Sequence, residues 1–329
     1  MTGQTGMDRG QTVFVETSAR LHFGMLDLRG DLGRKFGGLG AAAPAPTLLV
    51  SAHRADTLDA SGPDAERAAE FGRRFLDHQG AARADGARIC VHRALPSHAG
   101  LGSGTQLALA VARALAELYD LPANPPDLAR AVGRGQRSAI GTWTFAGGGL
   151  VVEGGRRDAN DTVAPLLARL AFPPAWQCVV VVPDAPPAVS GTAEDAAFAR
   201  LVRPSETDVA RVAHLVLMAL LPALAEGDLA AFGRALTTVQ TINGRWFAQV
   251  QGGTFSPGVS DELVRRMTEW GASGVGQSSW GPAVYGIVEA DAAGQRLVER
   301  VRGALEALAV PGSVYCGPFR TTGARVWRA

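Results

Sequence analysis

The amino-acid sequence predicts an α+β protein built from two domains. Its 329 residues exceed the size of one typical domain, and hydrophobic residues make up 47%, enough for a full-sized core. Predicted strands and helices follow one another without the regular alternation of a doubly wound parallel sheet. The Phe172-Pro173-Pro174 segment marks the boundary. It gives domains of residues 12–173 and 174–329 after a disordered start at residues 1–11.

The first half of the chain predicts strands separated by glycine-rich turns, and then helices. The β-favouring residues Val13, Phe14 and Val15 predict a strand over residues 12–18. Helical periodicity over residues 64–79, with Gly80 as a stop, predicts a helix. The further expected elements are strands at 47–52 and 87–94, helices at 105–119 and 127–136, and a strand at 147–153.

The second half predicts a buried strand followed by long helices. Residues 177–182 form a continuous apolar run bounded by Pro183, which is typical of a buried strand. Ser205 and Asp208 resemble a capping box at the start of a long helix that reaches Leu221. The further expected elements are helices at 228–241, 261–270 and 294–308, and strands at 281–289 and 312–316.

Composition excludes several classes of function. The formal net charge of +1 offers no basic field for nucleic acid. The three cysteines are sparse and form no Cys-x-x-Cys pair, which favours a reducing compartment, and residues 1–11 lack the pattern of a signal peptide. Residues 209–224 are apolar but short and interrupted by Arg211, His214 and Pro222, so we expect a buried helix. We therefore expect a cytoplasmic protein that acts on a small molecule, without nucleic-acid or membrane partners.

A glycine-rich loop between a predicted strand and a predicted helix is the sharpest chemical signal. Glycines let the backbone approach a ligand, and the free N–H groups at a helix start favour an anion. Hydroxyl side chains in the loop can also bind phosphate oxygens or magnesium. The pattern is neither a Walker A loop nor a dinucleotide-binding turn, and a tight turn without a ligand is the alternative. The expected phosphate-binding residues are Gly100, Leu101, Gly102, Ser103, Gly104, Thr105 and Gln106.

The loop and four other segments resemble a known family. Pro96 together with residues 100–103 is similar to the second signature, Pro-x-x-x-Gly-Leu-Gly-Ser-Ser, of the GHMP superfamily of small-molecule kinases. Residues 18–28, 34–41, 137–149 and 274–282 resemble one branch, the β-ribofuranosylaminobenzene 5′-phosphate synthases. The resemblance runs from about residue 13 to the C-terminus. It implies a ribosomal S5 domain 2-like N-terminal domain and a ferredoxin-like C-terminal domain.

Two departures from the kinase pattern support this branch. Kinases of the superfamily often carry a carboxylate that accepts the substrate's hydroxyl proton, but residues 141–145 contain none. Gly104 replaces the second serine of the signature, which weighs against a kinase-like magnesium site. An ATP-dependent GHMP kinase and a catalytically silent relative that binds a sugar phosphate stay open as alternatives.

The resemblance implies a decarboxylating phosphoribosyltransferase of tetrahydromethanopterin biosynthesis. Such an enzyme condenses phosphoribosyl pyrophosphate with p-aminobenzoate or 4-hydroxybenzoate and releases CO₂ and pyrophosphate. The resemblance also implies Mg²⁺ bound with the pyrophosphate, and a homodimer. No His/Cys or paired-carboxylate spacing in the sequence identifies metal ligands.

Three residues near the N-terminus are the expected catalytic groups. Arg20 offers a planar fork for carboxylate or phosphate. His22 can donate, accept or shuttle a proton near neutral pH. Asp27 could coordinate magnesium or bind a ribose hydroxyl. The alternatives are an Arg20–Asp27 ion pair and a structural histidine.

Further residues are expected at the substrates. Lys35 could contact a phosphate, although a solvated surface lysine is the alternative. Ser278 and Ser279 could bind a phosphate, and Trp280 could stack on the benzoate ring or belong to the core. The expected substrate-binding set is Phe36, Gly37, Gly38, Gln277, Ser278, Ser279 and Trp280.

Overall fold

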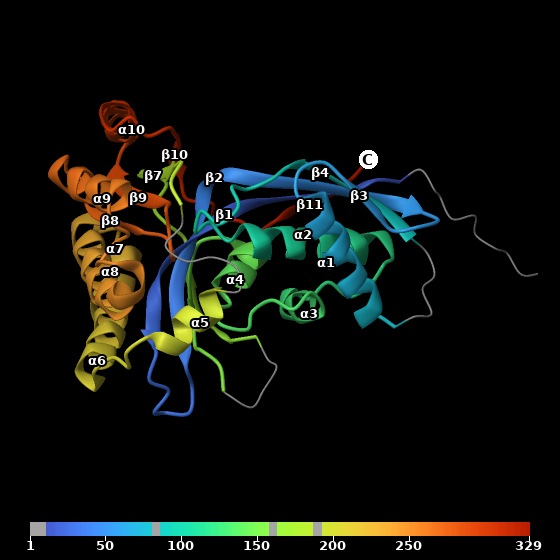
Figure 1. The fold of residues 1–329 in the computed structure, drawn as a ribbon, viewed down its shortest axis with the longest axis horizontal. Helices are drawn as coiled ribbons and strands as arrows, with labels where there is room; N and C mark the ends of the chain where they lie inside the picture. The colour runs from blue at the N-terminus through green and yellow to red at the C-terminus, as the bar shows by residue number, and fades with distance from the viewer. Residues whose placement is uncertain (1–10, 81–85, 158–162, 187–192) are drawn as a thin grey trace, which may run out of the picture.

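A computed structural model describes residues 11–80, 86–157, 163–186 and 193–329. The expected disordered start lies outside these residues, apart from Gln11. The chain folds into two β-sheets with helices packed on them, which confirms the α+β prediction (Figure 1). One sheet and helices α1 to α4 form the N-terminal part, and the second sheet forms the C-terminal part with α8 to α10.

The first sheet is built around a long antiparallel hairpin, β1 and β2. β1 pairs with β2 from Val13↔Ala52 to Asp27↔Phe36, so the strands predicted at 12–18 and 47–52 are too short. The glycine-rich start of β2 is itself paired, because a side chain at Gly40 would lie 2.3 Å from the Leu21 carbonyl oxygen. The strands are β1 (Val13–Asp27), β2 (Phe36–Ala55), β3 (Asp59–Ser61), β4 (Gly86–Arg93), β5 (Leu150–Glu153), β6 (Leu166–Leu170) and β11 (Arg325–Arg328).

Helices α1, α2 and α4 pack on the first sheet, with α2 at the centre of this layer, and α3 packs on these helices (Figure 1). α2 is buried on nearly all sides, and its many alanines allow its neighbours to approach closely. α4, which contains the segment at 141–145, was not predicted as a helix. The helices are α1 (Ala65–His78), α2 (Ser103–Leu118), α3 (Pro125–Ala131) and α4 (Ile140–Gly147).

The second sheet has the strand order β10-β7-β9-β8. Its two faces are both covered: Cys178 and Val180 share a core with α8, whereas Val179 and Val181 pack with α9 and α10. Burial on both faces explains the continuous apolar run of β7. The elements are β7 (Trp176–Pro183), α8 (Leu229–Gln251), α9 (Val259–Glu269), β8 (Gly274–Gln277), β9 (Val284–Glu289), α10 (Asp291–Ala307) and β10 (Gly312–Pro318).

The last strand returns to the first sheet. β11 pairs antiparallel with β1, with Phe14 opposite Trp327. The chain passes from one sheet to the other near Phe172, whose ring stacks on Phe319 at 3.8 Å between centroids. The residue range predicted for the second domain, 174–329, therefore includes a strand that belongs to the first sheet.

The long helix after Ser205 is one-sided in its burial. It runs through α6 (Glu206–Leu215), η1 (Val216–Leu220) and α7 (Leu221–Glu226), after the short α5 (Ala193–Arg200). Ser205 caps it by accepting a hydrogen bond from the Asp208 N–H at 3.0 Å, as predicted. The expected full burial is wrong, because Leu217 and Met218 are 61% and 67% exposed. Residues 206–226 are long and apolar enough to cross a membrane, a weak indication because helices in soluble cores pass the same test.

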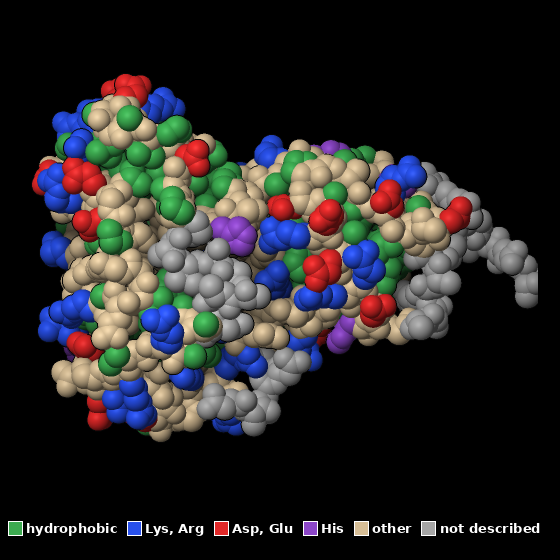
Figure 2. Space-filling view, viewed as in Figure 1, with side chains coloured by type: hydrophobic (Ala, Val, Ile, Leu, Met, Phe, Trp, Pro, Cys, Tyr) green, Lys and Arg blue, Asp and Glu red, His purple; other side chains and the backbone are tan. Residues whose placement is uncertain are grey.

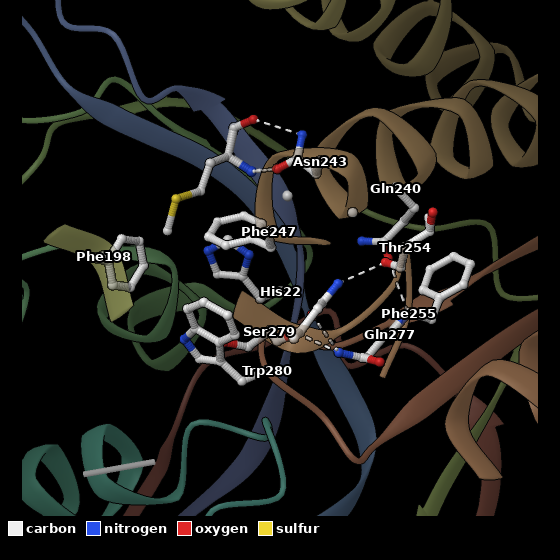
Figure 3. A pocket seen from close by; sticks show the side chains of 14 residues that line it. His22, Phe198, Gln240, Asn243, Phe247, Thr254, Phe255, Gln277, Ser279 and Trp280 are labelled. Carbon is white, nitrogen blue, oxygen red and sulfur yellow. Dashed lines mark hydrogen bonds between the residues drawn. The ribbon is translucent and has the colours of Figure 1, made fainter. Parts of the chain in front are cut away.

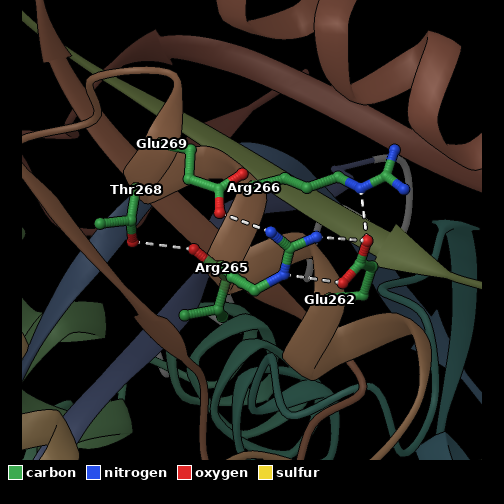
Figure 4. Close-up of polar contacts among 6 residues, drawn as sticks. Glu262, Arg265, Arg266, Thr268 and Glu269 are labelled. Atoms are coloured by element: carbon green, nitrogen blue, oxygen red, sulfur yellow. Dashed lines mark hydrogen bonds and ion pairs between the residues drawn. The ribbon is translucent and has the colours of Figure 1, made fainter.

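Surface charges compensate one another locally. Basic and acidic side chains are interspersed over the face drawn in Figure 2. On α9, Glu262 accepts hydrogen bonds from Arg265 and Arg266 (Figure 4), and these bonds lower the pKa of Glu262 to about 2. This face therefore carries no broad field of one sign.

Candidate active site

The glycine-rich loop lies where β1, the start of α2 and the C-terminal sheet meet. Gly100 and Gly102 have φ angles of 79° and 74°, and a side chain at Gly100 would lie 2.1 Å from the Ser278 carbonyl oxygen. Ser278 Oγ donates to the Gly100 carbonyl at 2.6 Å and accepts the His22 N–H at 3.0 Å. Ser278 thus ties the loop to β1 from the C-terminal part of the chain.

Arg20 brings a guanidinium group to this loop. Its Nη1 donates to the Gly100 carbonyl at 2.6 Å, and its N–H donates to the Leu101 carbonyl at 3.0 Å. Gly102 packs on the Arg20 side chain, since a Cβ there would lie 2.7 Å from Cγ. The structure therefore places Arg20 beside the loop that the sequence assigned to phosphate.

Asp27 lies at the far end of the same strand. Its Oδ1 accepts the N–H groups of Arg29 and Gly30 at 2.5 and 3.0 Å, and so closes the β1–β2 turn. Seven residues of strand separate it from Arg20, about 20 Å at the usual rise. The alternative ion pair between Arg20 and Asp27 is therefore not formed, and Asp27 is not brought to the loop.

A pocket lined by aromatic side chains lies next to the loop (Figure 3). Its empty volume is about 490 Å³. Trp280, Phe247 and Phe198 meet edge to face, with ring centroids 5.0 to 5.9 Å apart. This arrangement offers apolar walls to a flat ring, and Trp280 is one of the residues that line the pocket. The two phenylalanines were not predicted.

His22 points into this pocket near Phe247 and Trp280 (Figure 3). Its side chain is buried, with 7% of its surface exposed, and Nε2 has no hydrogen-bond partner among the described residues. Burial, and secondly the charge of Arg20, lower the pKa of His22 to about 3. The imidazole is therefore neutral at physiological pH, and Nε2 is a buried polar atom without a partner among the described residues.

Amide side chains hold the walls of the pocket in place. Gln240 donates to the Phe23 carbonyl at 2.7 Å, and Asn243 bonds both the N–H and the carbonyl of Met25. Gln277 accepts the Ser256 N–H at 2.7 Å and donates to the Ser279 carbonyl at 3.1 Å. The Gln277 side chain, expected to bind substrate, thus supports the loop that carries Ser279 and Trp280.

The loop and the pocket share one strand. Arg20 and His22 pair regularly with Ala42 and Gly40, so their side chains leave the same face of β1. Two residues of strand separate their Cα atoms by about 7 Å. An anion at the loop and a ring in the pocket would therefore lie side by side.

Three other predicted phosphate-binding residues lie in the first turn of α2. Gln106 is fully buried, accepts from Thr17 at 2.7 Å and donates to the Gly141 carbonyl at 3.0 Å, so its side chain connects α2 to β1 and α4. The side chain of Thr105 also packs on Gly141. Ser103 is the first residue of α2.

Lys35 lies away from the loop. It pairs with Arg156 through its backbone, and its ammonium lies 5.7 Å from the centre of the Phe36 ring. Phe36 contacts Phe198, an edge-to-face neighbour at 6.1 Å, from the side of a second pocket. Gly37 and Gly38 lie where β2 passes close to Glu153, and His22 also contacts Gly38.

The described residues form no protein cage for a metal ion. No three His, Cys, Asp or Glu side chains gather within 11–80, 86–157, 163–186 and 193–329. Hard cations such as Mg²⁺ are commonly bound by one or two carboxylates together with substrate phosphates.

Comparison with known proteins identifies the family. Residues 65–148 match the GHMP kinases N terminal domain and residues 220–307 match the GHMP kinases C terminal domain. The beta-ribofuranosylphenol 5′-phosphate synthase of Methanothermobacter thermautotrophicus is 33% identical over 95% of this chain and 98% of its own. This chain belongs to that synthase family. The synthase of Archaeoglobus fulgidus is 34% identical over 85% of this chain and 89% of its own.

Solved structures show that the synthase family shares its fold with GHMP kinases. A homoserine kinase from Cytophaga hutchinsonii superposes with a TM-score of 0.69 over 99% of this chain and all of its own, at 17% identity. A Lactococcus lactis galactokinase, complexed with galactose, gives a TM-score of 0.66 at 14% identity, over 97% and 96% of the two chains. These similarities confirm the predicted two-part GHMP fold. The synthase relatives make this chain a transferase.

Glu153 is a buried residue near His22 that was not among the predicted site residues. It is fully buried on β5 and accepts the Gly155 N–H at 2.8 Å and the Ala139 N–H at 3.4 Å. A side chain at Gly38 would lie 3.6 Å from both Glu153 Oε1 and His22 Nε2. Burial raises the pKa of Glu153 to about 7, against the two backbone hydrogen bonds. Only the pairing of β2 with β5 brings it here, so no local pattern marks it.

This raised pKa predicts a loss of stability as the pH rises from about 4.5 to about 7. Glu153 binds its proton more tightly in the folded state, so its contribution is complete below pH 4.5 and is lost as the pH rises through 7. The slope approaches about 1.4 kcal/mol per pH unit within this window. Urea unfolding of wild type and Glu153→Gln at pH 5 and pH 8 measures it. We expect the free energy of unfolding of the variant, relative to wild type, to be higher at pH 8 than at pH 5. A pH-independent difference would contradict the raised pKa.

Proposed function

We propose that this protein transfers the phosphoribosyl group of phosphoribosyl pyrophosphate to a para-substituted benzoate, with loss of CO₂, in tetrahydromethanopterin biosynthesis. The observation that carries the proposal is the placement of an anion-binding loop and an aromatic pocket side by side along β1. A kinase for a small alcohol needs the loop but has no use for the aromatic walls. The relatives' name contains phenol, which favours 4-hydroxybenzoate over p-aminobenzoate.

The reaction needs no net proton transfer. The C1–oxygen bond of the ribose breaks and pyrophosphate leaves with the electron pair, so C1 gains oxocarbenium character. The ring carbon that bears the carboxylate then supplies a π-electron pair to form the carbon–carbon bond. Loss of CO₂ returns its bonding pair to the ring and restores aromaticity. Holding the two substrates face to face can contribute about 7–11 kcal/mol to lowering the barrier.

The loop and Arg20 stabilise the leaving pyrophosphate. The first N–H groups of α2 and the Ser103 hydroxyl are its donors at the helix start. Arg20 adds a guanidinium held to Gly100, which compensates the charge that develops on the departing oxygen. When bound with the diphosphate, Mg²⁺ would neutralise part of its charge.

His22 acts on the aromatic substrate. When the ring attacks C1, positive charge spreads to the para substituent. The imidazole of His22 is neutral in the resting enzyme. Its Nε2 accepts a hydrogen bond from the para hydroxyl and so stabilises the positive charge that develops on that group. Trp280 and Phe247 orient the ring. We further propose that the protein is a homodimer in the cytoplasm.

Two variants test the layout because each serves as the control for the other. Ser103→Ala removes a hydrogen bond to a charged group, worth about 1.5–3 kcal/mol, and should raise the KM for phosphoribosyl pyrophosphate by about 10-fold or more. Trp280→Leu removes a pocket wall and should raise the KM for 4-hydroxybenzoate instead. Steady-state kinetics with each substrate varied in turn measures both. If both variants change the same KM, or neither changes any, the assignment of loop and pocket is wrong.

A further inference from the structure

Gly104 leaves room for an arginine at the start of α2. A Cβ built on Gly104 would lie 2.8 Å from Nη2 of Arg67 and 3.3 Å from Nη2 of Arg134. The superfamily signature has a serine at this position, whose side chain would therefore point into the space that the Arg67 guanidinium occupies. The replacement of serine by glycine and the position of Arg67 thus fit together.

Arg67 is held in this orientation from its other end. Its Nη1 donates to Asp64 Oδ1 at 3.2 Å and to Ser97 Oγ at 3.4 Å. One third of its side chain is exposed, so the guanidinium remains accessible to a ligand. Asp64 precedes α1 and Ser97 precedes the glycine loop, so contacts from two segments aim Nη2 at Gly104.

Arg134 reaches the same point from a third segment. It follows α3 in the chain, and its guanidinium lies 4.9 Å from the centre of the Phe71 ring of α1. Since Nη2 atoms of both arginines lie within 3.3 Å of one point at Gly104, they are at most about 6 Å apart. Two positive charges this close repel each other, and an anion bound between them relieves that repulsion.

The arginines on the surface of α9 show a different arrangement. There Glu262 and Glu269 bind Arg265, and Glu262 also binds Arg266 (Figure 4). The guanidinium groups of α9 thus face carboxylates within one helix. Arg67 likewise pairs with a carboxylate, Asp64, through Nη1, but its Nη2 is directed at Gly104, where Arg134 arrives from another segment.

We propose that Arg67, with Arg134 beside it, binds the diphosphate group of the substrate across Gly104, opposite Arg20. This inference rests on the proposed function. Arg20 lies on the Gly102 side of the loop and Arg67 on the Gly104 side, so the two guanidinium groups hold the anion from both sides. Arg67 then takes the place of the serine hydroxyl in the signature, so a charged, planar guanidinium replaces a neutral donor at the diphosphate.

Pyrophosphate binding tests the proposal without turnover. Isothermal titration with pyrophosphate at a fixed Mg²⁺ concentration compares wild type with Arg67→Ala, Arg67→Lys and Gly104→Ser. We expect affinity to fall at least 10-fold in Arg67→Ala and less in Arg67→Lys, which keeps the charge but loses the fork. Gly104→Ser should keep its fold, because only the flexible end of the Arg67 side chain must move. It should still bind pyrophosphate more weakly, because Arg67 is displaced. Arg73→Ala, which removes an exposed arginine of the same helix, is the matched control and should bind like wild type.

A titration with ribose 5-phosphate distinguishes the two phosphate ends of the substrate. Its affinity should be unchanged in Arg67→Ala, and a fall equal to that for pyrophosphate would overturn the assignment to the diphosphate. Unchanged pyrophosphate affinity in a folded Arg67→Ala variant would overturn the proposal while leaving the proposed function intact. Weaker pyrophosphate binding in a protein that forms no ribosylated product would instead refute the function and support the site.

Discussion

His22→Ala is expected to lower kcat by about 10²- to 10³-fold, the usual cost of removing one electrostatic contact to the developing charge. The variant loses the imidazole that lines the pocket, including its buried Nε2, while the backbone N–H that bonds Ser278 stays in place. Because Nε2 has no hydrogen-bond partner in the part of the chain that the structure describes, we expect a small change in melting temperature. Steady-state kinetics and thermal unfolding of the same preparation measure both effects.

The matched control for this variant is His214→Ala, which removes an exposed histidine of α6. It should leave both kcat and the melting temperature unchanged. Since the pKa of His22 is about 3, the wild-type rate should also show no histidine titration between pH 5 and 8. A His22→Ala variant that loses stability in proportion to its activity would assign His22 to structure.

The second large effect is expected from alanine at Gly100. Its Cβ would meet the Ser278 carbonyl at 2.1 Å and the Gly281 N at 3.3 Å, and neither backbone atom can move aside cheaply. With the positive φ, we expect a loss of about 3 kcal/mol or more in the free energy of unfolding. Urea unfolding measures this loss, which should also loosen the contact between the two parts of the chain.

Gly102→Ala is the matched comparison two residues away. Its Cβ meets only the Arg20 side chain, at 2.7 Å from Cγ, and the positive φ costs about 1–2 kcal/mol. We therefore expect a folded protein with weaker binding of phosphoribosyl pyrophosphate, because Arg20 is displaced. Equal loss of stability in both variants would show that the loop acts only as a turn.

The elements with strong local patterns were predictable from the sequence. The helix over α1, the cap at Ser205 and the buried strand β7 follow from periodicity, a capping residue and an apolar run. The glycine-rich start of β2 was not recognised as a strand, because glycine has low strand propensity and is needed here for close approach to β1. β11 was missed because only pairing with β1, over 300 residues away, makes it a strand.

The candidate site shows the same division. Arg20, His22 and Trp280 were predicted and lie together around the loop and the pocket. Phe198 and Phe247 come from helices of the C-terminal part, and Arg67 from α1, so their role depends on how distant segments pack.

Asp27 and Lys35 are close in sequence to the site residues, but the extended strand carries them away from it. Short sequence distance therefore does not imply proximity in space where the backbone is fully extended.

Product analysis tests the central claim most directly. The protein is incubated with Mg²⁺, phosphoribosyl pyrophosphate and 4-hydroxybenzoate labelled in its carboxyl carbon, and parallel samples receive ATP in place of phosphoribosyl pyrophosphate. We expect labelled CO₂ and pyrophosphate in equal amounts, an aryl riboside phosphate without the label, and no ADP in the parallel samples. Absence of labelled CO₂, together with formation of ADP and a phosphorylated acceptor, would contradict the account and assign the loop to ATP.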